Sequence, residues 1–320
     1  MYPTEVLKKA RDEYGKRKEQ FVSKNQNYIA GIFDTLPQVK ALSAEISRTS
    51  AMLAISIING SEVEKNVDKI KEFNLLKNRE IKALLVKNGF PADALSPKYY
   101  CSLCCDRGIY NGKTCKCVTD IQKEIMYQRL GSGENLDAYS FNDIKLSYYD
   151  DQKAHMEKSI SKCVEFAESF STNSKSMIFS GGVGLGKTHI SKAIGKIIID
   201  KGFDVFYIPF TTLSTRLESA KFGRSEGSYQ QFLDPVINCD LLILDDLGAE
   251  FSTAFTTALL YEIINTRLLN KLPTIINTNL DYDGIGERYG ERILSRLANC
   301  FSFILFKGKD IRMKKKFSLS

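Results

Sequence analysis

The sequence lacks the segments that would place a protein in a membrane or export it from the cell. It contains no run of about eighteen apolar residues, so no helix is expected to span a bilayer and no membrane is expected as a partner. Residues 1–10 hold no apolar core of signal-peptide length, which favours the cytoplasm. Internal repeats and low-complexity tracts are also lacking, and the 43% hydrophobic and 26% charged residues are ordinary for globular domains.

Positive charge is concentrated at the end of the sequence. The formal net charge is +7, and six cations lie in the last fourteen residues, namely Lys307, Lys309, Arg312, Lys314, Lys315 and Lys316. A basic tail can hold nucleic-acid phosphates through counterion release. It can equally be a solvated end without a partner, and the sequence leaves both interpretations open.

The cysteines cluster in one short segment. Five of the eight lie between residues 101 and 117, whereas Cys163, Cys239 and Cys300 stand in apolar contexts that are typical of buried thiols. In a cytoplasmic protein such a cluster indicates a metal site rather than disulfide bonds.

The cluster contains two pairs of possible ligands, Cys101-x2-Cys104 and Cys115-x-Cys117. Four thiolates in a tetrahedral array suit a structural Zn²⁺, and such a closed site leaves no position open for catalysis. Cys105 is a spare thiol that could replace Cys104. An iron–sulfur cluster or a redox pair are the alternative interpretations.

The N-terminal part of the chain is predicted to be helical. Residues 4–30 and 37–90 are rich in Lys, Glu, Leu and Ile at helical spacing, and Asn88-Gly89 is typical of a helix end. The last of these helices is expected to carry an apolar stripe of Leu75, Leu76, Ile81, Leu84 and Leu85.

Two modules are expected along the chain. The cysteine segment at 97–118 is followed by a second short helix at 118–130 and then by Gly131-Ser-Gly133, which is a candidate linker. We therefore predict a helical N-terminal module with a zinc knuckle over residues 1–130 and a second domain over 131–320.

The second domain shows a different pattern, in which apolar runs alternate with amphipathic stretches. Strands that are apolar on both faces and alternate with helices indicate a mostly parallel sheet covered by helices, which is an α/β fold. The five expected strands are 177–179, 205–208, 241–244, 274–277 and 301–306.

A glycine-rich loop lies between the first of these strands and the helix that follows. Gly181-x4-Gly186-Lys187-Thr188 matches the phosphate-binding loop, in which consecutive backbone N–H groups wrap a polyphosphate that side chains would obstruct. The helix that starts near Lys187 adds its positive dipole end. Lys187 would reach the β- and γ-phosphates, and the Thr188 hydroxyl would ligate Mg²⁺.

Two carboxylates and an amide follow two other strands of the predicted sheet. Asp245 and Asp246 end the run Leu241–Leu244, and Asn279 follows the strand at 274–277. Open α/β sheets bind ligands at the carboxyl ends of their strands. Asp245 would hold Mg²⁺ through its water shell, Asp246 would orient or deprotonate the attacking water, and Asn279 would contact the γ-phosphate or that water.

Two arginines near the C-terminus share a helix face. Arg292 and Arg296 are four residues apart, and one of them could enter the site of a neighbouring subunit as an arginine finger. A surface arginine paired with Glu287 or Glu291 is the alternative interpretation.

Four aromatic residues stand between the two modules, within residues 137–149: Tyr139, Phe141, Tyr148 and Tyr149. Such rings can stack on adenine or on the bases of single-stranded DNA. They more often seal a strand against the core, and we expect packing with a partial contact to adenine.

These motifs, in this order, resemble those of AAA+ ATPases, and among them the DnaC/DnaI-type helicase loaders and the IstB transposition helpers. The resemblance covers residues 135–320, and some loaders also carry a zinc-binding N-terminal domain. It implies ATP as the nucleotide, Asn279 as sensor 1, Arg296 as the arginine finger, and Arg312 as a late arginine that acts like sensor 2. The implied nucleotide-binding residues are Gly181, Gly182, Val183, Gly184, Leu185, Gly186, Lys187, Thr188 and His189.

The sequence departs from the AAA+ pattern at two points. Most AAA+ enzymes have glutamate where this chain has Asp246, and the shorter side chain predicts slow hydrolysis that suits a switch. Little chain remains after residues 301–306, so the helical lid of most AAA+ proteins is expected to be reduced or absent.

The resemblance implies an ATP-controlled loader in which the N-terminal module binds the replicative DNA helicase. The AAA+ domain would bind single-stranded DNA, and the chain would self-associate through its ATP site. From residues alone, a helical oligomerisation arm is an equally open interpretation of the N-terminal module.

Two other functions stay open at this point. One is an IstB-type transposition helper that binds duplex DNA, and the other is a nucleotide-binding scaffold without turnover. A GTPase is disfavoured because the sequence has no Asn-Lys-x-Asp motif, and the elements at Asn279 and Arg296 disfavour a small-molecule kinase.

Overall fold

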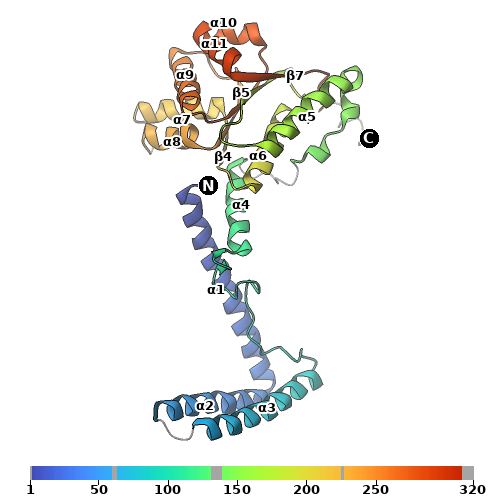
Figure 1. Cartoon of the computed structure of the whole chain (residues 1–320), viewed down its shortest axis with the longest axis vertical. Coiled ribbons are helices and arrows are strands. Elements are labelled where there is room, and N and C mark those ends of the chain that lie inside the picture. Colours follow the sequence, from blue (N-terminus) through green and yellow to red (C-terminus); the bar gives the residue numbers. More distant parts are fainter. Residues whose placement is uncertain (1, 60–62, 131–138, 225–226, 312–320) are drawn as a thin grey trace. The chain divides into compact units, whose positions relative to one another are not determined.

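The computed structural model describes residues 2–59, 63–130, 139–224 and 227–311 (Figure 1). The chain divides into two compact units, one of which is Arg11–Thr119. The other comprises Met1–Ala10 together with Asp120–Ser320. No helix within the described ranges is long and apolar enough to cross a bilayer.

Helices dominate the Arg11–Thr119 unit. They are α1 (Thr4–Thr35), which belongs to this unit from Arg11 onward, α2 (Pro37–Asn59) and α3 (Val63–Lys87). The predicted helical character of this region is confirmed. Proline is well tolerated as the first residue of a helix, where its missing N–H would have no partner. Pro37 therefore ends α1 and begins α2 without the loss of a helical hydrogen bond.

The helices α2 and α3 pack against each other and against the end of α1. Their shared core contains Ile32, Val39, Leu42, Ile81 and Leu85. The predicted helix end is confirmed, since α3 stops at Lys87 and Gly89 adopts a left-handed φ of 80°.

The predicted apolar stripe on α3 is wrong in its first part. Leu75 and Leu76 are 57% and 58% exposed. Steps of four and seven residues back from the buried Ile81 lead to Lys77 and Asn74, so the two leucines lie off the packed face.

The cysteine segment forms a small hairpin. Strands β1 (Ile109–Tyr110) and β2 (Lys113–Thr114) pair antiparallel, and helix α4 (Lys116–Leu130) follows. The helix predicted at 118–130 is therefore confirmed, and it begins two residues earlier. From Asp120 onward its residues belong to the other unit, where Met126 and Leu130 are fully buried.

The unit that contains Asp120–Ser320 is an α/β structure. After α4 it contains η2 (Phe141–Asp143), η3 (Leu146–Gln152), α5 (Lys153–Ser169), β3 (Ser176–Gly181), α6 (Lys187–Asp200), β4 (Val205–Pro209), α7 (Phe210–Lys221), α8 (Tyr229–Asn238), β5 (Leu241–Leu247), α9 (Ala254–Leu269), β6 (Thr274–Thr278), α10 (Tyr282–Tyr289), α11 (Glu291–Cys300) and β7 (Phe301–Phe306).

Its five strands form one parallel sheet in the order β4-β5-β6-β3-β7. All five predicted strands and their parallel arrangement are confirmed. Strand β6 lies between β3 and β5. The carboxyl ends of these three strands therefore meet at one edge of the sheet.

Helices cover both faces of this sheet (Figure 1). Alternate residues of each strand point to opposite sides, so Leu242 and Leu244 pack with the helices α7 to α11, whereas Ile243 packs with α4, α5 and α6. Burial on both faces explains why the strands read as continuous apolar runs.

Some predictions fall outside the described residues. The candidate linker Gly131-Ser-Gly133 and most of the basic tail belong to this group, as does Arg312. After β7 the described chain continues only to Ile311, so a reduced lid stays a prediction. The functional boundary at residue 130 also stays a prediction.

A buried acid at the start of β4 predicts a pH dependence of stability. Asp204 pairs with Arg129 of α4 at 3.2 Å, and its backbone N–H donates to Asp240. Burial raises the pKa of Asp204 to about 6, although Arg129 opposes the shift. The folded state therefore binds this proton more tightly than the unfolded state. The protonated Asp204 therefore stabilises the folded state fully below its unfolded pKa, near 4, and this stabilisation is lost as the pH rises through about 6.

Asp204→Asn is expected to remove this contribution to the pH dependence of the free energy of unfolding between pH 4 and 6. Urea denaturation at a series of pH values would measure it. Asp200→Asn is the matched control, since Asp200 is an exposed carboxylate that contacts Tyr127 and Lys123 of α4. An unchanged slope in Asp204→Asn would show that this carboxyl is not the titrating group.

Candidate functional site

The loop between β3 and α6 requires glycine at particular positions. Gly181 and Gly184 have φ values of 148° and 74°, which L side chains rarely adopt. A Cβ atom at Gly181 would collide with the Phe306 carbonyl, and one at Gly184 would collide with the Asp310 carboxylate. The loop therefore leaves its backbone bare because neighbouring groups occupy the space that side chains would need.

Lys187 lies at the centre of this loop and is only 6% exposed. Its ammonium group donates to the carbonyls of Gly181 and Gly182 at 2.6 and 2.7 Å, and to Asn279 Oδ1 at 2.7 Å. Asn279 follows β6, so the structure brings together two residues that the sequence predicted for one phosphate site.

Thr188 and Asp245 are also brought together. The Thr188 hydroxyl lies 3.1 Å from both carboxylate oxygens of Asp245, which is 3% exposed at the end of β5. Tyr207 of β4 donates to Oδ2 at 2.5 Å, and Asn277 Nδ2 of β6 donates to Oδ1 at 2.7 Å. Three hydrogen-bond donors thus hold this carboxylate in one orientation.

Asp246 differs from its neighbour in exposure and backbone conformation. Its side chain is exposed, and its φ of 52° is unusual for a residue other than glycine. The pairing of β5 with β6 is irregular between Leu244 and Leu247. This irregularity turns Asp246 toward the cavity while Asp245 stays buried.

One cavity of about 640 Å³ joins these groups. The loop residues Val183 to His189, both aspartates and Asn279 contribute to its wall. The aromatic stretch before α5 closes another side through Tyr139, Tyr148 and Tyr149. Its volume falls in the range that small-molecule and cofactor sites occupy.

The aromatic residues mainly pack, as predicted. Tyr149 is fully buried and donates to the Leu185 carbonyl at 3.0 Å. The Tyr139 ring lies 5.4 Å from the His189 ring, and His189 Nε2 lies 3.0 Å from the Ser140 carbonyl. A contact to adenine stays a prediction.

Tyr207, Asn277 and Lys192 were not predicted from the sequence. Lys192 is buried beside the site, with its ammonium 4.6 Å from the Tyr139 ring and 4.8 Å from the Tyr207 ring. Tyr207 and Asn277 are polar residues near the carboxyl ends of apolar strands, and this pattern could have identified them in the sequence as candidate site residues. Their common partner, Asp245, comes from a third strand and could not be inferred.

A buried glutamate fixes the loop after Asp246. Glu250 Oε2 accepts from the Gly248 N–H at 2.9 Å, and its Oε1 accepts from Tyr289 at 2.5 Å and from Arg288 Nε at 3.3 Å. Burial and Glu250 raise the pKa of Tyr289, which keeps its hydroxyl protonated as a donor. The loop is thereby tied to the end of α10.

The structure places Arg296 on its own domain. Its guanidinium lies 4.5 Å from the Tyr261 ring of α9 and donates to the Tyr261 hydroxyl at 2.7 Å and to Asn265 at 3.2 Å. Arg292, one turn earlier, is exposed. Among the described residues, neither arginine belongs to the wall of the cavity in the same chain. An arginine finger acts on the nucleotide of a neighbouring subunit, so it has to lie outside the cavity of its own chain.

The four predicted cysteine ligands also come together. The thiol sulfurs of Cys101, Cys104, Cys115 and Cys117 lie within 4.8 Å of one another. The Cys101–Cys115 and Cys104–Cys117 sulfur distances are both 3.8 Å. Zn–S bonds of about 2.3 Å in a tetrahedron place sulfurs about 3.8 Å apart, so the donor set fits zinc.

The thiols of the cluster differ in how easily they ionise: burial, and next the neighbouring thiols, raise the pKa of Cys117. Burial opposes ionisation of Cys104, but the Gly108 N–H and the neighbouring thiols lower its pKa to about 6. Cys105 is exposed, has a φ of 47° and directs its thiol to the Ser102 carbonyl at 3.7 Å.

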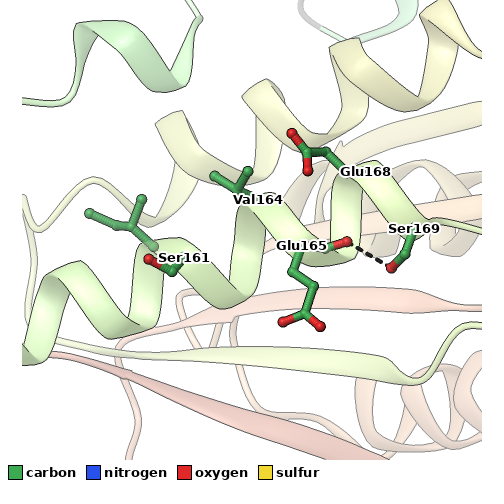
Figure 2. A pocket seen from close by; sticks show the side chains of 6 residues that line it. Ser161, Val164, Glu165, Glu168 and Ser169 are labelled. Carbon is green, nitrogen blue, oxygen red and sulfur yellow. Dashed lines mark hydrogen bonds between the residues drawn. The ribbon is translucent and has the colours of Figure 1, made fainter.

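A second hollow, of about 470 Å³, lies along α5 (Figure 2). Ser161, Val164, Glu165, Glu168 and Ser169 line it with Ile160, and the Ser169 hydroxyl donates to the Glu165 carbonyl at 2.7 Å. All of these side chains come from one helix. The hollow therefore lacks the converging groups of a catalytic or binding site.

The chain is similar to curated proteins named replicative helicase loader. The chain is 30% identical over 151 residues to the replicative helicase loader DnaC of Buchnera aphidicola subsp. Baizongia pistaciae, which covers 47% of this chain and 61% of that protein. It is 30% identical over 138 residues to the replicative helicase loader DnaC of Escherichia coli K12, and this match covers 43% of this chain and 56% of that protein. The chain thus spans about three-fifths of the length of these curated relatives.

One solved structure matches part of the chain. A crystal structure of the DnaC helicase loader aligns with a TM-score of 0.46 and 26% identity, and covers 52% of this chain and 98% of that one. The model of the family described as IstB-like ATP binding protein matches residues 135–318. With the sheet and the loop described above, this match confirms the predicted AAA+ type of P-loop fold. A helical N-terminal region precedes this domain in the sequence. The chain therefore belongs to the family of IstB-like ATP-binding proteins.

Proposed function

We propose that the protein is an ATPase that loads a replicative DNA helicase onto single-stranded DNA and uses ATP binding and slow hydrolysis as a switch. The observation that carries this proposal is the joint placement of Lys187, Thr188, Asp245 and Asn279 around one cavity. The names of its relatives, replicative helicase loaders, supply the partner class.

Lys187 and Asn279 would report whether a γ-phosphate is present. The Lys187 ammonium now satisfies its donors with two loop carbonyls and Asn279. Phosphate oxygens are stronger acceptors for this cation, so ATP would replace some of these partners. Asn279 would then be released from Lys187 to contact the γ-phosphate or the attacking water.

Thr188 and Asp245 would hold Mg²⁺, whose oxygen ligands are of this kind. The ion would neutralise the charge that develops on the phosphates. Asp246, exposed beside the same cavity, would orient and deprotonate the attacking water. Aspartate reaches less far than glutamate, which supports a slow reaction.

Tyr207 supports the Mg²⁺ site by orienting Asp245 through a 2.5 Å hydrogen bond. Tyr207→Phe is expected to raise the Mg²⁺ concentration needed for half-maximal ATP binding by about tenfold, a usual effect of losing a partner of a metal ligand. Titration of a fluorescent ATP analogue at several Mg²⁺ concentrations measures this.

Nucleotide affinity without Mg²⁺ should stay the same in Tyr207→Phe. Tyr229→Phe removes a hydroxyl that contacts Glu262 away from the cavity and is the matched control. A wild-type Mg²⁺ requirement in Tyr207→Phe would refute this role.

Arg296 would act on the ATP of a neighbouring subunit, so that ATP promotes self-association. To do so it would exchange Tyr261 and Asn265 for phosphate oxygens. Arg292 stays the alternative finger because it is already exposed on the same helix face.

Single-stranded DNA would bind near the carboxyl end of α7. Arg224 lies 5.8 Å from the ring of Phe222, which is 59% exposed, and Lys221 lies 5.2 Å from the ring of Phe255. The exposed ring of Phe222 suits a stacked base, and the two neighbouring cations suit phosphates.

The N-terminal unit would bind the helicase, and a structural zinc would hold its knuckle together. The fit of the four sulfur positions to a tetrahedral ion supports zinc. Leu75 and Leu76 of α3 supply exposed apolar side chains of the kind that protein partners cover.

Asp246→Asn tests the loading cycle. With the cognate helicase and circular single-stranded DNA, the wild type should deliver helicase and dissociate, whereas Asp246→Asn should bind ATP and stay trapped in the complex. Co-sedimentation of both proteins with the DNA measures this. Full cycling by Asp246→Asn would favour a scaffold without turnover. Recruitment to duplex circles alone would favour a transposition helper.

A further inference from the structure

One face of α1 packs on the cysteine segment. Tyr14, Lys18 and Phe21 are spaced four and three residues apart and so share this face. The rings of Tyr14 and Phe21 lie 5.9 and 6.3 Å from the ring of Tyr100. Lys18 Nζ donates to the Asp106 carbonyl at 3.4 Å.

The segment that α1 contacts is the one that positions the first two cysteine ligands. The Asp106 carboxylate accepts from the backbone N–H groups of Cys101 at 2.8 Å and Tyr100 at 3.2 Å. The Gly108 N–H donates to Cys104 Sγ at 3.4 Å. A Cβ atom added to Gly108 would lie 3.7 Å from the Tyr14 ring, so Tyr14 reaches the immediate surroundings of Cys104.

The Tyr14 hydroxyl is buried here without a satisfactory partner. Among the described residues, its oxygen is one of two buried side-chain polar atoms that make no hydrogen bond. A tyrosine hydroxyl carries a proton and can donate a hydrogen bond. Buried donors without a partner are rare in proteins because they lose their hydrogen bonds to water.

We propose that the Tyr14 hydroxyl donates a hydrogen bond to the Cys104 thiolate when the four cysteines hold zinc. This inference rests on the zinc site proposed above. A metal-bound thiolate is a better acceptor than a neutral thiol, so the metal supplies the partner that this hydroxyl lacks. Tyr14 is then a positioning residue that makes the attachment of α1 to the knuckle depend on the metal.

The test compares zinc release from the full-length wild type, Tyr14→Phe and Tyr100→Phe to a chromogenic chelator. Phenylalanine keeps the Tyr14 ring and removes only the donor. We expect Tyr14→Phe to hold one zinc per chain but to bind it about tenfold more weakly. Its midpoint of zinc release on acidification should also move to higher pH, because the thiolate loses a donor that favours its charged form. Tyr100→Phe, which removes a hydroxyl from the neighbouring ring, should match the wild type.

Wild-type affinity and wild-type pH midpoint in Tyr14→Phe would overturn the inference while the zinc site stands. Equal losses in both variants would also overturn it, since the loss would then not be specific to the Tyr14 hydroxyl. A wild type without bound metal would reject the zinc site itself, and this inference with it.

Hydrogen exchange on the wild type gives a second readout if Tyr14→Phe does not fold. Chelation should speed amide exchange in residues 11–21 of α1, and unchanged exchange there would contradict the proposal.

Discussion

Lys187→Ala is expected to lower ATP affinity by on the order of a hundredfold or more and to reduce turnover to background. The ammonium group is buried, and its present partners, the carbonyls of Gly181 and Gly182 and the Asn279 side chain, lie at the position proposed above for the phosphates. Without it, the site loses the ammonium group that the loop carbonyls hold in place to offset the phosphate charge. Equilibrium binding of a fluorescent ATP analogue and phosphate release measure the two effects.

Lys196→Ala is the matched control for this variant. Lys196 lies on the same helix, α6, and is outside the cavity lining formed by the described residues. It should keep wild-type affinity and turnover. Retention of tight ATP binding by Lys187→Ala would show that the nucleotide lies elsewhere.

Cys104→Ser is expected to reduce bound zinc from one ion per chain to none and to unfold the knuckle. In the described structure of this segment, the regular structure before α4 is a hairpin of two strands, β1 and β2, with two residues each, so we expect the knuckle to depend on the proposed metal in addition to its contacts with α1. Structural zinc supplies on the order of 10 kcal/mol of folding free energy in small domains. Metal analysis and limited proteolysis between residues 97 and 118 measure the loss.

The adjacent Cys105 provides the control. It is exposed and turned to the Ser102 carbonyl, so Cys105→Ser should keep its zinc and its resistance to protease. The opposite pattern, with zinc lost only in Cys105→Ser, would show that Cys105 is the ligand in solution.

The sequence predicted the phosphate loop and the sheet because each depends on local pattern. Four glycines, a lysine and a threonine between an apolar run and a helix determine the loop, and continuous apolar runs determine doubly covered strands. Lys187 and Asn279 could be placed in one site since both follow strands whose carboxyl ends share an edge.

The rest depends on side-chain partners that are far apart in sequence. Tyr207 and Asn277 both contact Asp245 from neighbouring strands, and nothing near either residue identifies that partner. The alternative interpretation of Arg296 gave it a glutamate partner in its own chain, yet it lies on Tyr261 because α11 packs beside α9. The position of Cys104 rather than Cys105 within the cluster likewise depends on a left-handed turn at Cys105.

The measurement that tests the central claim most directly is ATP turnover by the purified full-length protein. The protein is assayed alone, with single-stranded DNA, with duplex DNA, and with its cognate replicative helicase. We predict a low basal rate that single-stranded DNA and helicase change and that Lys187→Ala abolishes. A rate that responds to duplex DNA alone, or tight ATP binding with no turnover under any condition, would contradict the helicase-loader account.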